Sequence, residues 1–254
     1  MTESTPRPIV TPSEGLDTAD LRLKTPAGDL PAYFAKPKGR DNLPIVLIAE
    51  EIFGLNEHIR DVVRRFAHLD YFAIAPDFLT RYGDVAHAPD IDAIRAIVAK
   101  VPDGETMDDF DAALDFAKKN GGDASRAAIA GFCWGGRIAW LYAAHNPRLR
   151  AAIPWYGRLK SAPSPAQARW PLDIASEVKV PTLGLYGGAD PSIPLEQVEE
   201  MRAKLKAAGA KAEIVVYDGA PHAFFADYRE SYREGPAKDA WRRAIKFLRE
   251  QGVE

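Results

Sequence analysis

The feature that most constrains the fold is a regular alternation, from Pro44 onward, of short continuous apolar runs with longer amphipathic stretches. Parallel strands that helices cover on both faces are apolar throughout, whereas the crossover helices between them carry apolar residues at helical spacing. The apolar runs lie at 44–50, 72–78, 127–132, 151–157, 182–188 and 212–218. The sequence therefore predicts an α/β protein with a doubly wound, mostly parallel sheet flanked by helices.

The chain before Pro44 has a different character. Residues 1–20 are rich in Pro, Thr, Ser and Glu, a composition that buries little apolar surface and predicts a flexible tail. Residues 21–39 are typical of two short strands around a turn at 27–29, which indicates a hairpin. The Pro- and Ser-rich stretch 161–171 indicates a surface excursion between two strands. We therefore expect a single domain over residues 21–254.

Composition excludes several classes of function. Apolar residues make up 46% of the chain and charged residues 27%, with a net charge of -3 and basic residues spread along the sequence, so nothing indicates a nucleic-acid partner. No segment reaches the roughly 18 to 20 apolar residues that span a bilayer, so we expect no membrane partner. The single cysteine excludes an intrachain disulfide and argues against a Cys-rich zinc site. A cytoplasmic location is the expectation.

The residues around Cys133 have the pattern of a nucleophile elbow. The run Gly131-Phe132-Cys133-Trp134-Gly135 follows an apolar strand and precedes a helix-like segment. Small residues two positions before and after the nucleophile permit the sharp turn, and the helix N-terminus favours the reactive thiolate. A lone cysteine can equally be a small buried hydrophobic residue, but the strand, turn and helix context favours a catalytic role.

Two further residues complete a triad in the order of the α/β-hydrolase fold, which is nucleophile, acid, histidine. His222 follows the last apolar run and can act as the base, while Asp190 follows the preceding run and can orient the imidazole. By itself, Asp190 would be read as a turn or helix-capping residue. The other four histidines are interpreted as solvated or packing residues.

Taken together, the motifs resemble the dienelactone hydrolase family, the carboxymethylenebutenolidases. The resemblance runs from about Leu21 to the C-terminus, and the motifs that carry it are EEIFGLN (50–56), APDFLTR (75–81), GFCWGG (131–136), PWYG (154–157), GGADPSIP (187–194) and GAPHAF (219–224). It implies a single α/β-hydrolase domain and a triad of Cys133, Asp190 and His222. It also implies a metal-free and cofactor-free enzyme that opens cyclic enol lactones to a dienoic acid.

The resemblance also implies roles for residues beside the triad. Glu51 would be the carboxylate that in this family interacts with the resting thiol and helps to generate the thiolate, in a protected site. Its alternative is an ordinary surface acid, for which the neighbouring Glu50 is the better candidate. The backbone N–H groups of Ile52 and Trp134 would form the oxyanion hole.

Substrate contacts are expected at two more positions. Arg81 matches a family arginine that binds the substrate carboxylate, and a solvated loop arginine is its alternative. Tyr156 matches a pocket tyrosine, with core packing as its alternative. The chain departs from the family after the histidine, where the usual serine and second substrate arginine are missing. Arg229 or Arg233 could replace that arginine, and the added Phe224 and Phe225 suggest a more apolar or bulkier substrate.

Three hypotheses remain open at this point. The first is covalent hydrolysis of an enol lactone or related ester through a thioester on Cys133. The second is a protein of the same fold that binds a ligand or senses redox state without catalysis. The third keeps catalysis but changes the substrate to a simple carboxylester or thioester. The small-molecule partner is thus a lactone or ester, and we expect a monomer or a small homo-oligomer.

Overall fold

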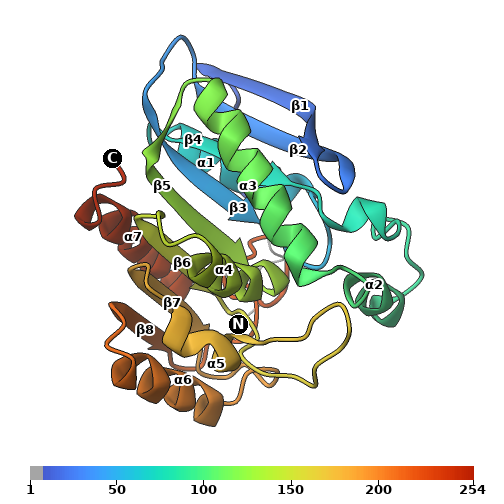
Figure 1. Ribbon diagram of the computed structural model, residues 1–254, viewed down its shortest axis with the longest axis vertical. Helices are drawn as coiled ribbons and strands as arrows, with labels where there is room; N and C mark the ends of the chain where they lie inside the picture. The colour runs from blue at the N-terminus through green and yellow to red at the C-terminus, as the bar shows by residue number, and fades with distance from the viewer. Residues whose placement is uncertain (1–7) are drawn as a thin grey trace, which may run out of the picture.

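The computed structural model describes residues 8–254, which form an eight-stranded sheet with helices on both faces (Figure 1). The strands are β1 (Leu16–Thr25), β2 (Gly28–Pro37), β3 (Leu43–Ala49), β4 (Phe72–Pro76), β5 (Gly122–Phe132), β6 (Ala151–Trp155), β7 (Thr182–Gly187) and β8 (Ala212–Tyr217). The helices are α1 (Glu57–Ala67), α2 (Ile91–Val98), α3 (Asp103–Lys119), α4 (Trp134–His145), α5 (Pro171–Ile174), α6 (Leu195–Ala207) and α7 (Glu234–Glu250), with short 3-10 turns η1 (Leu79–Arg81) and η2 (Ala175–Glu177). The α/β architecture predicted from the apolar runs is confirmed.

The strand order places the carboxyl ends of the central strands together. Across the sheet the order is β1-β2-β4-β3-β5-β6-β7-β8. Strands β3 to β8 run parallel, whereas β2 is antiparallel to both of its neighbours. The chain order reverses beside β3, because β4 lies on one side of it and β5 on the other. In open α/β sheets, ligands bind at the carboxyl ends of the strands near such a reversal.

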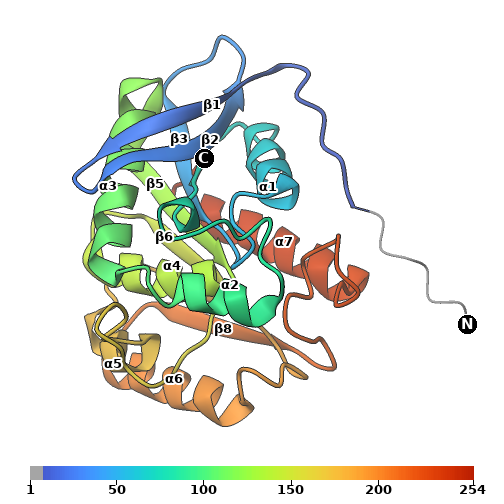
Figure 2. The same cartoon turned by 90° about the vertical axis from the view of Figure 1, so that its right-hand side faces the viewer.

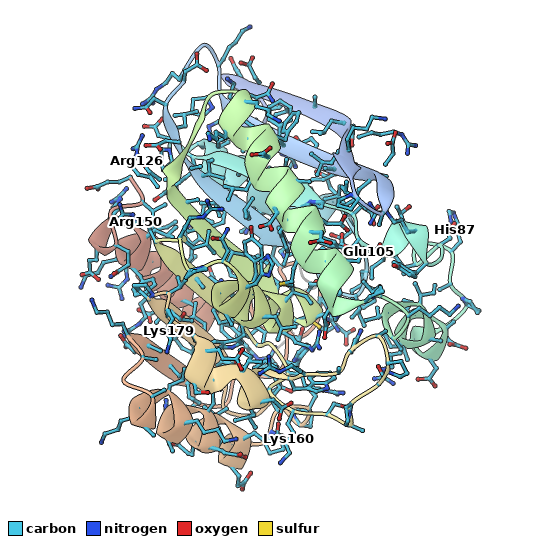
Figure 3. All side chains as sticks on the ribbon, in the orientation of Figure 1. His87, Glu105, Arg126, Arg150, Lys160 and Lys179 are labelled. Atoms are coloured by element: carbon cyan, nitrogen blue, oxygen red, sulfur yellow. The ribbon has the colours of Figure 1, made fainter. Side chains whose placement is uncertain are left out.

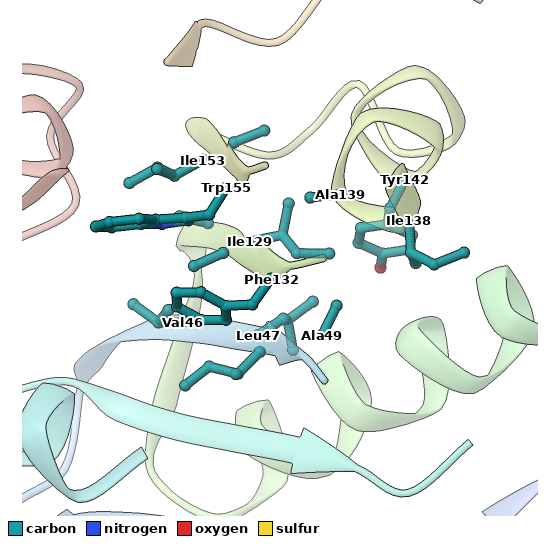
Figure 4. Packing of buried hydrophobic residues seen from close by; sticks show 14 of the residues in the cluster. Val46, Leu47, Ala49, Ile129, Phe132, Ile138, Ala139, Tyr142, Ile153 and Trp155 are labelled. Atoms are coloured by element: carbon teal, nitrogen blue, oxygen red, sulfur yellow. The ribbon is translucent and has the colours of Figure 1, made fainter. Parts of the chain in front are cut away.

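Helices form a layer on each side of the sheet. In Figure 2, α1 and α7 lie on one face, while α3, α4, α5 and α6 lie on the other. The strands are buried between these layers because they are almost wholly apolar: every residue of β3, β4, β6 and β7 is buried. Figure 4 shows the packing at the centre, where the rings of Phe132 and Trp155 lie beside Val46 and Ile153. Within residues 8–254, no helix is long and apolar enough to cross a membrane.

The N-terminal region differs from expectation at its boundary. The predicted hairpin is present, with Thr25 paired to Gly28 across the turn. Its first strand begins at Leu16, so the boundary expected at residue 20 was wrong by several residues. Residues before the strand also contact α1, where Arg64 Nε donates a hydrogen bond to Thr11 O at 2.8 Å. The part of the predicted tail at 1–7 lies outside the described residues.

The predicted excursion connects β6 to α5 and β7. Residues 158–170 contain no helix or strand, and they pack against the segment between α2 and α3. The Asp103 N–H donates to Ala166 O at 2.9 Å, and Gln167 Nε2 donates to Val98 O at 2.8 Å. The buried Arg137 of α4 pairs with the Asp103 carboxylate and donates to Arg169 O. The excursion is therefore held by specific hydrogen bonds.

Candidate active site

Cys133 occupies the turn between β5 and α4. Its φ is 57°, in the left-handed region that residues with a side chain rarely adopt. Two glycines make this turn possible, since a Cβ on Gly131 would lie 2.0 Å from Gly135 O, and a Cβ on Gly135 would lie 2.2 Å from Ala49 O. The thiol is half-buried at the carboxyl end of the sheet. Cys133 thus has the backbone geometry of a nucleophile elbow.

His222 and Asp190 reach Cys133 from the loops that follow β8 and β7. His222 Nε2 lies 3.2 Å from Cys133 Sγ. On the other side of the ring, His222 Nδ1 lies 2.6 Å from Asp190 Oδ2. The three side chains therefore form one hydrogen-bonded row, as their order along the chain predicts.

The charges of this row support one another. Burial opposes a positive charge on His222, but its hydrogen bonds to Asp190 and Cys133 raise its pKa to about 10. Burial also opposes the negative charge on Asp190, but the hydrogen bond and charge of His222 together with two hydrogen bonds from Ser192 hold the pKa of Asp190 below its ordinary value. An imidazolium beside a sulfur stabilises the thiolate. The raised pKa of His222 thus favours a positively charged imidazole beside the Cys133 sulfur.

Ser192 supports the carboxylate and was missed from the sequence. Its Oγ donates to Asp190 Oδ1 at 2.6 Å, and its backbone N–H donates to the same oxygen at 2.8 Å. Ser192 Oγ also lies 3.4 Å from His222 Nδ1. The signal was available, because an aspartate followed two positions later by a serine is typical of a turn closed by side-chain hydrogen bonds. Ser192 thus fixes the carboxylate that faces the imidazole.

Two backbone N–H groups near the thiol have no acceptor within the described residues, those of Ile52 and Trp134. Trp134 is the first residue of α4, where an N–H has no acceptor inside the helix. Ile52 lies in the loop after β3, which the hydrogen bond from Gly135 N–H to Glu50 O at 3.0 Å holds against the start of α4. Both groups are therefore free to bind a ligand, while the oxyanion hole that the resemblance implies stays a prediction.

Glu51 is fully buried beside the elbow and is held by the loop after β8. The Tyr228 hydroxyl donates to Glu51 Oε2 at 2.8 Å, and Arg229 Nη1 lies 4.0 Å from Glu51 Oε1. Within residues 8–254, no hydrogen bond joins Glu51 to the Cys133 thiol. The resemblance implied a contact with the resting thiol, but here the carboxylate is bound to Tyr228, a residue that sequence reasoning missed.

Glu50 corrects a second expectation. It was the better candidate for an ordinary surface acid, yet the structure buries it completely. Its Oε1 accepts a hydrogen bond from Phe78 N–H at 3.0 Å, and its Oε2 is without a partner. Burial, with the nearby negative charge of Asp77, raises the pKa of Glu50 well above its ordinary value. Glu50 is therefore a buried carboxyl group at the end of β3 whose protonated form is favoured by its surroundings.

Tyr156 lies at the site and in the core at once. Its ring is fully buried and packs edge-on against His222, with ring centroids 5.3 Å apart. Its hydroxyl is buried with no hydrogen-bond partner. Burial, with the nearby Glu51 and Cys133, raises the pKa of Tyr156 well above its ordinary value. The structure shows Tyr156 as a core residue beside the His222 ring, and its role as a pocket residue stays a prediction.

Phe224 and Phe225 do not enlarge a substrate pocket. Both are almost completely buried. The Phe225 ring stacks on Trp241 of α7 and packs on Trp155, while the Phe224 ring packs against Tyr156. The expectation that they accommodate a bulkier substrate was wrong, because both rings are packed in the core, Phe225 between the sheet and α7 and Phe224 on strand-end aromatic rings.

Arg81 has acceptors of its own within the protein. Its guanidinium pairs with Glu105 and Asp109 of α3, with nitrogen–oxygen distances of 2.7 and 2.8 Å. It also donates to Thr25 Oγ1 at 2.7 Å and to Gly28 O at 2.9 Å, at the turn of the first hairpin. Figure 3 shows Glu105 on α3, toward this hairpin. The structure therefore gives Arg81 a position between α3 and the hairpin and does not support the expected role in substrate binding.

Of the two alternative arginines, Arg229 lies at the site. Besides approaching Glu51, its guanidinium lies over the Phe53 ring, 5.2 Å from the centroid, and its side chain is 32% exposed. Arg233 instead donates to the carbonyl oxygens of Glu230 and Tyr232 and precedes α7. Arg229 is thus the arginine that combines contact with the site and exposure to a ligand.

The site offers a thiol, an imidazole, carboxylates, phenol groups and free backbone N–H groups at one edge of the sheet. Within residues 8–254, no group of three or more His, Cys, Asp or Glu side chains is arranged to hold a metal ion. A nucleophile in line with a base, a supporting acid and two N–H donors is the arrangement that acyl transfer requires.

Comparison with known proteins agrees with this geometry. The family model described as the dienelactone hydrolase family matches residues 30–252. A Salmonella typhimurium protein, provisionally named a carboxymethylenebutenolidase, is 50% identical over 249 residues, which is 97% of this chain and 92% of that protein. A Bradyrhizobium protein, provisionally named a 2-oxo-3-(5-oxofuran-2-ylidene)propanoate lactonase, is 30% identical over 222 residues, covering 86% of this chain and 88% of that one.

A solved structure has the same fold over nearly the whole chain. It is a provisionally assigned dienelactone hydrolase from Klebsiella pneumoniae, 49% identical, with a TM-score of 0.90 over 92% of this chain and 98% of that one. The chain belongs to the dienelactone hydrolase family, and it is an α/β-hydrolase-fold hydrolase of the carboxymethylenebutenolidase type.

Proposed function

We propose that this chain hydrolyses a lactone or carboxylic ester through a thioester on Cys133. The observation that carries the proposal is the row from Cys133 Sγ to His222 Nε2 at 3.2 Å and from His222 Nδ1 to Asp190 Oδ2 at 2.6 Å, set at a strand–turn–helix elbow. Nucleophilic catalysis needs a nucleophile within hydrogen-bond reach of a base that a third group orients. This row meets that condition.

In the first half of the reaction, the Cys133 thiolate attacks the carbonyl carbon and forms a C–S bond. The carbonyl oxygen becomes an oxyanion, which the N–H groups of Ile52 and Trp134 stabilise. The tetrahedral intermediate collapses with cleavage of the C–O bond, and the His222 imidazolium gives its proton to the leaving oxygen. In a lactone, the leaving oxygen stays attached to the acyl chain as a ring-opened enol or alcohol.

In the second half, His222 removes a proton from water as the water attacks the thioester carbonyl. The oxyanion forms again at the same N–H groups, the C–S bond breaks, and the acid leaves. Asp190 keeps the imidazole oriented through both halves and stabilises its positive charge, and Ser192 keeps Asp190 in place. The products contain all the atoms of the substrate and of one water molecule, and the enzyme returns to its starting state.

The substrate we propose first is an enol lactone of the dienelactone kind, as the names of the family and its relatives suggest. Arg229 would bind its carboxylate, because this guanidinium is partly exposed and lies beside Glu51. An incoming carboxylate would compete with Glu51 for Arg229 through paired, charge-assisted hydrogen bonds.

A simple carboxylic ester is the second candidate. The observation that favours it is the position of Arg81, whose guanidinium is taken up by Glu105, Asp109 and Thr25. With Arg81 engaged in this way, the site has less positive charge for a carboxylate than the family pattern implies. A neutral ester needs no such charge.

The test is hydrolysis of cis- and trans-dienelactone beside p-nitrophenyl acetate, by the wild type, Cys133→Ala and Cys133→Ser. We expect the wild type to open a dienelactone much faster than it cleaves the simple ester, and Cys133→Ala to abolish both activities. Cleavage of only the simple ester, dependent on Cys133, would support the second candidate. Turnover that survives in folded Cys133→Ala would refute the thioester mechanism.

A further inference from the structure

We propose that Tyr228 is a positioning residue that holds the Glu51 carboxylate away from the Cys133 thiol, so that the thiol stays paired with His222 before substrate arrives. The proposal rests on the proposed function, since it concerns the preparation of the same nucleophile. It departs from the arrangement that the family resemblance implied, in which this carboxylate interacts with the resting thiol.

The contacts of Glu51 carry the first step. The side chain is fully buried, so its charge depends on protein donors. Tyr228 supplies the one hydrogen bond recorded for it within residues 8–254, at 2.8 Å to Oε2, and Arg229 Nη1 stands 4.0 Å from Oε1. Both donors come from the loop after β8. That loop therefore draws the carboxylate toward itself.

The loop is anchored on α1 by a buried ionic cluster, which carries the second step. The Asp227 carboxylate pairs with Arg65 through one oxygen and with His58 Nδ1 through the other, the latter at 3.3 Å. Asp227 and His58 are almost completely buried. The His58 ring also lies against the Tyr228 ring, with centroids 5.1 Å apart. Tyr228 is thus held by its anchored chain neighbour Asp227 and by contact with the His58 ring.

The third step asks what Glu51 would do without Tyr228. Glu51 contacts Tyr228 and approaches Arg229, both from the loop after β8. Tyr156, at the end of β6, lies near Glu51 and near Cys133. His222 contacts both Cys133 and Tyr156. The Tyr156 hydroxyl, which has no hydrogen-bond partner, and the Cys133 thiol are side-chain donors of the same site. A carboxylate that accepts the thiol proton stabilises the neutral thiol, and a charged one opposes the thiolate. Both effects lower the thiolate fraction.

The experiment is the pH dependence of Cys133 alkylation by iodoacetamide, without substrate. Alkylation reports the thiolate, and its apparent pKa belongs to the coupled Cys133–His222 pair. For Tyr228→Phe we expect a raised apparent pKa and alkylation at pH 7 slower by about threefold or more, which is about half a pKa unit. The double variant Glu51→Gln with Tyr228→Phe should return to the wild-type profile. Asp227→Asn should also raise the apparent pKa of Cys133 alkylation, but by a smaller amount than Tyr228→Phe.

The matched control is Tyr71→Phe, which removes a buried hydroxyl that donates to Val253 O at 3.0 Å, far from the thiol in the chain and in its contacts. It should leave the alkylation profile unchanged. An unshifted or lowered pKa in Tyr228→Phe, or a shift that persists in the double variant, overturns the proposal. If Tyr228→Phe does not fold, the Glu51→Gln variant tests the proposal instead. Removing the charge of a carboxylate that is already held away from the thiol should change the rate of Cys133 alkylation by no more than about twofold. A larger change overturns the proposal.

The outcomes separate this proposal from the proposed function. Cys133-dependent hydrolysis with an unshifted alkylation profile would leave the thioester mechanism in place and remove the role of Tyr228. The expected shift in the alkylation profile without any Cys133-dependent hydrolysis would support the role of Tyr228 and refute the thioester mechanism.

Discussion

The elbow around Cys133 and the loop from His222 to Arg233 build the same site in different ways. The elbow is held by backbone: Gly131 and Gly135 pack directly on carbonyl oxygens, and a Cβ at either would lie within 2.2 Å of one. The loop is held by side chains, through Asp227 on Arg65 and His58 and through two buried phenylalanines. The first arrangement tolerates almost no change, while the second can be altered one contact at a time.

The contrast indicates how chemistry and specificity are divided. The elbow carries the proposed nucleophile and Trp134, and the loop after β3 that packs on it carries Ile52, so these two N–H groups would serve any acyl substrate. The loop brings Tyr228 and Arg229 to Glu51, where a particular substrate would be recognised. Changes in the elbow should therefore cost the fold, and changes in the loop should affect which substrate is used.

The largest effect is expected for Gly135→Ala. The new Cβ would lie 2.2 Å from Ala49 O, against backbone that cannot move without displacing β3, so we expect a loss of more than about 4 kcal/mol of unfolding free energy, or failure to fold. Gly104→Ala is the control, because that exposed position in α3 has no atom within 4 Å of a new Cβ and should gain about 0.5–1 kcal/mol. Urea unfolding measures both. Equal stability of the two variants would contradict the claim that the elbow tolerates almost no change.

A smaller loss is expected for Asp227→Asn. The change removes one charge from a buried pair and leaves Arg65 with Asp61, so roughly 2–4 kcal/mol should be lost. Asp239→Asn is the control, since the half-buried Asp239 pairs with exposed arginines and should cost below about 1 kcal/mol. The measurement is thermal or urea unfolding of both variants. A loss as small as that of the control would mean that the loop is not anchored through Asp227.

The two arginines should separate stability from substrate binding. Arg81→Gln leaves the buried Asp109 without its partner and should cost about 1–3 kcal/mol, with the KM for a carboxylate-bearing lactone unchanged. Arg229→Gln should leave stability within about 0.5 kcal/mol and raise that KM roughly tenfold, by loss of a charge-assisted hydrogen bond. Unfolding and steady-state kinetics on both variants decide this. The reverse pattern would restore Arg81 to the role that the family resemblance implies.

The smallest effect, and one that depends on pH, is expected for Glu50→Gln. Because burial raises the pKa of Glu50, the folded protein holds a proton that the unfolded chain releases. The contribution of Glu50 to stability is therefore present below its ordinary pKa and is lost as the pH rises toward the folded value. Glutamine can replace the protonated acid, so the variant should match the wild type near pH 4 and become the more stable by up to about 1 kcal/mol near pH 8. A constant difference across this range would contradict the buried proton.

The sequence was informative where local pattern decides structure. The apolar runs predicted the strands of the central sheet, and the glycines around Cys133 predicted the elbow, because both depend on neighbouring residues. The order of Cys133, Asp190 and His222 predicted the contacts within the row, since parallel strands bring their carboxyl ends to one edge. The distances of that row agree with the prediction, while its catalytic role stays a proposal.

The errors concern contacts between distant parts of the chain. Tyr228 and Glu51 are 177 residues apart, and Arg81 is 56 residues from Thr25, so neither pairing leaves a local pattern. Glu50 is charged in the sequence but buried by the packing of β3, β4 and α4 around it. The phenylalanines after His222 were interpreted as pocket residues, although Phe225 packs on Trp241 of α7 and Phe224 on Tyr156 and Tyr217. In each case the role of the residue depends on a contact with a distant part of the chain, and the local sequence does not show that contact.

Helix α1 connects the two regions of the site mechanically. Its N-cap, Asn56, ends the loop that carries Ile52, and its side chain accepts a hydrogen bond from Ile59 N–H at 3.1 Å. The next turns of the same helix carry His58 and Arg65, which hold Asp227. Hydrogen exchange should therefore find these two loops opening together with α1, as one cooperative unit. A single loosening of this helix would release the loop that carries Ile52 and the loop that carries Arg229 in the same event, so the proposed chemistry and specificity would be lost together.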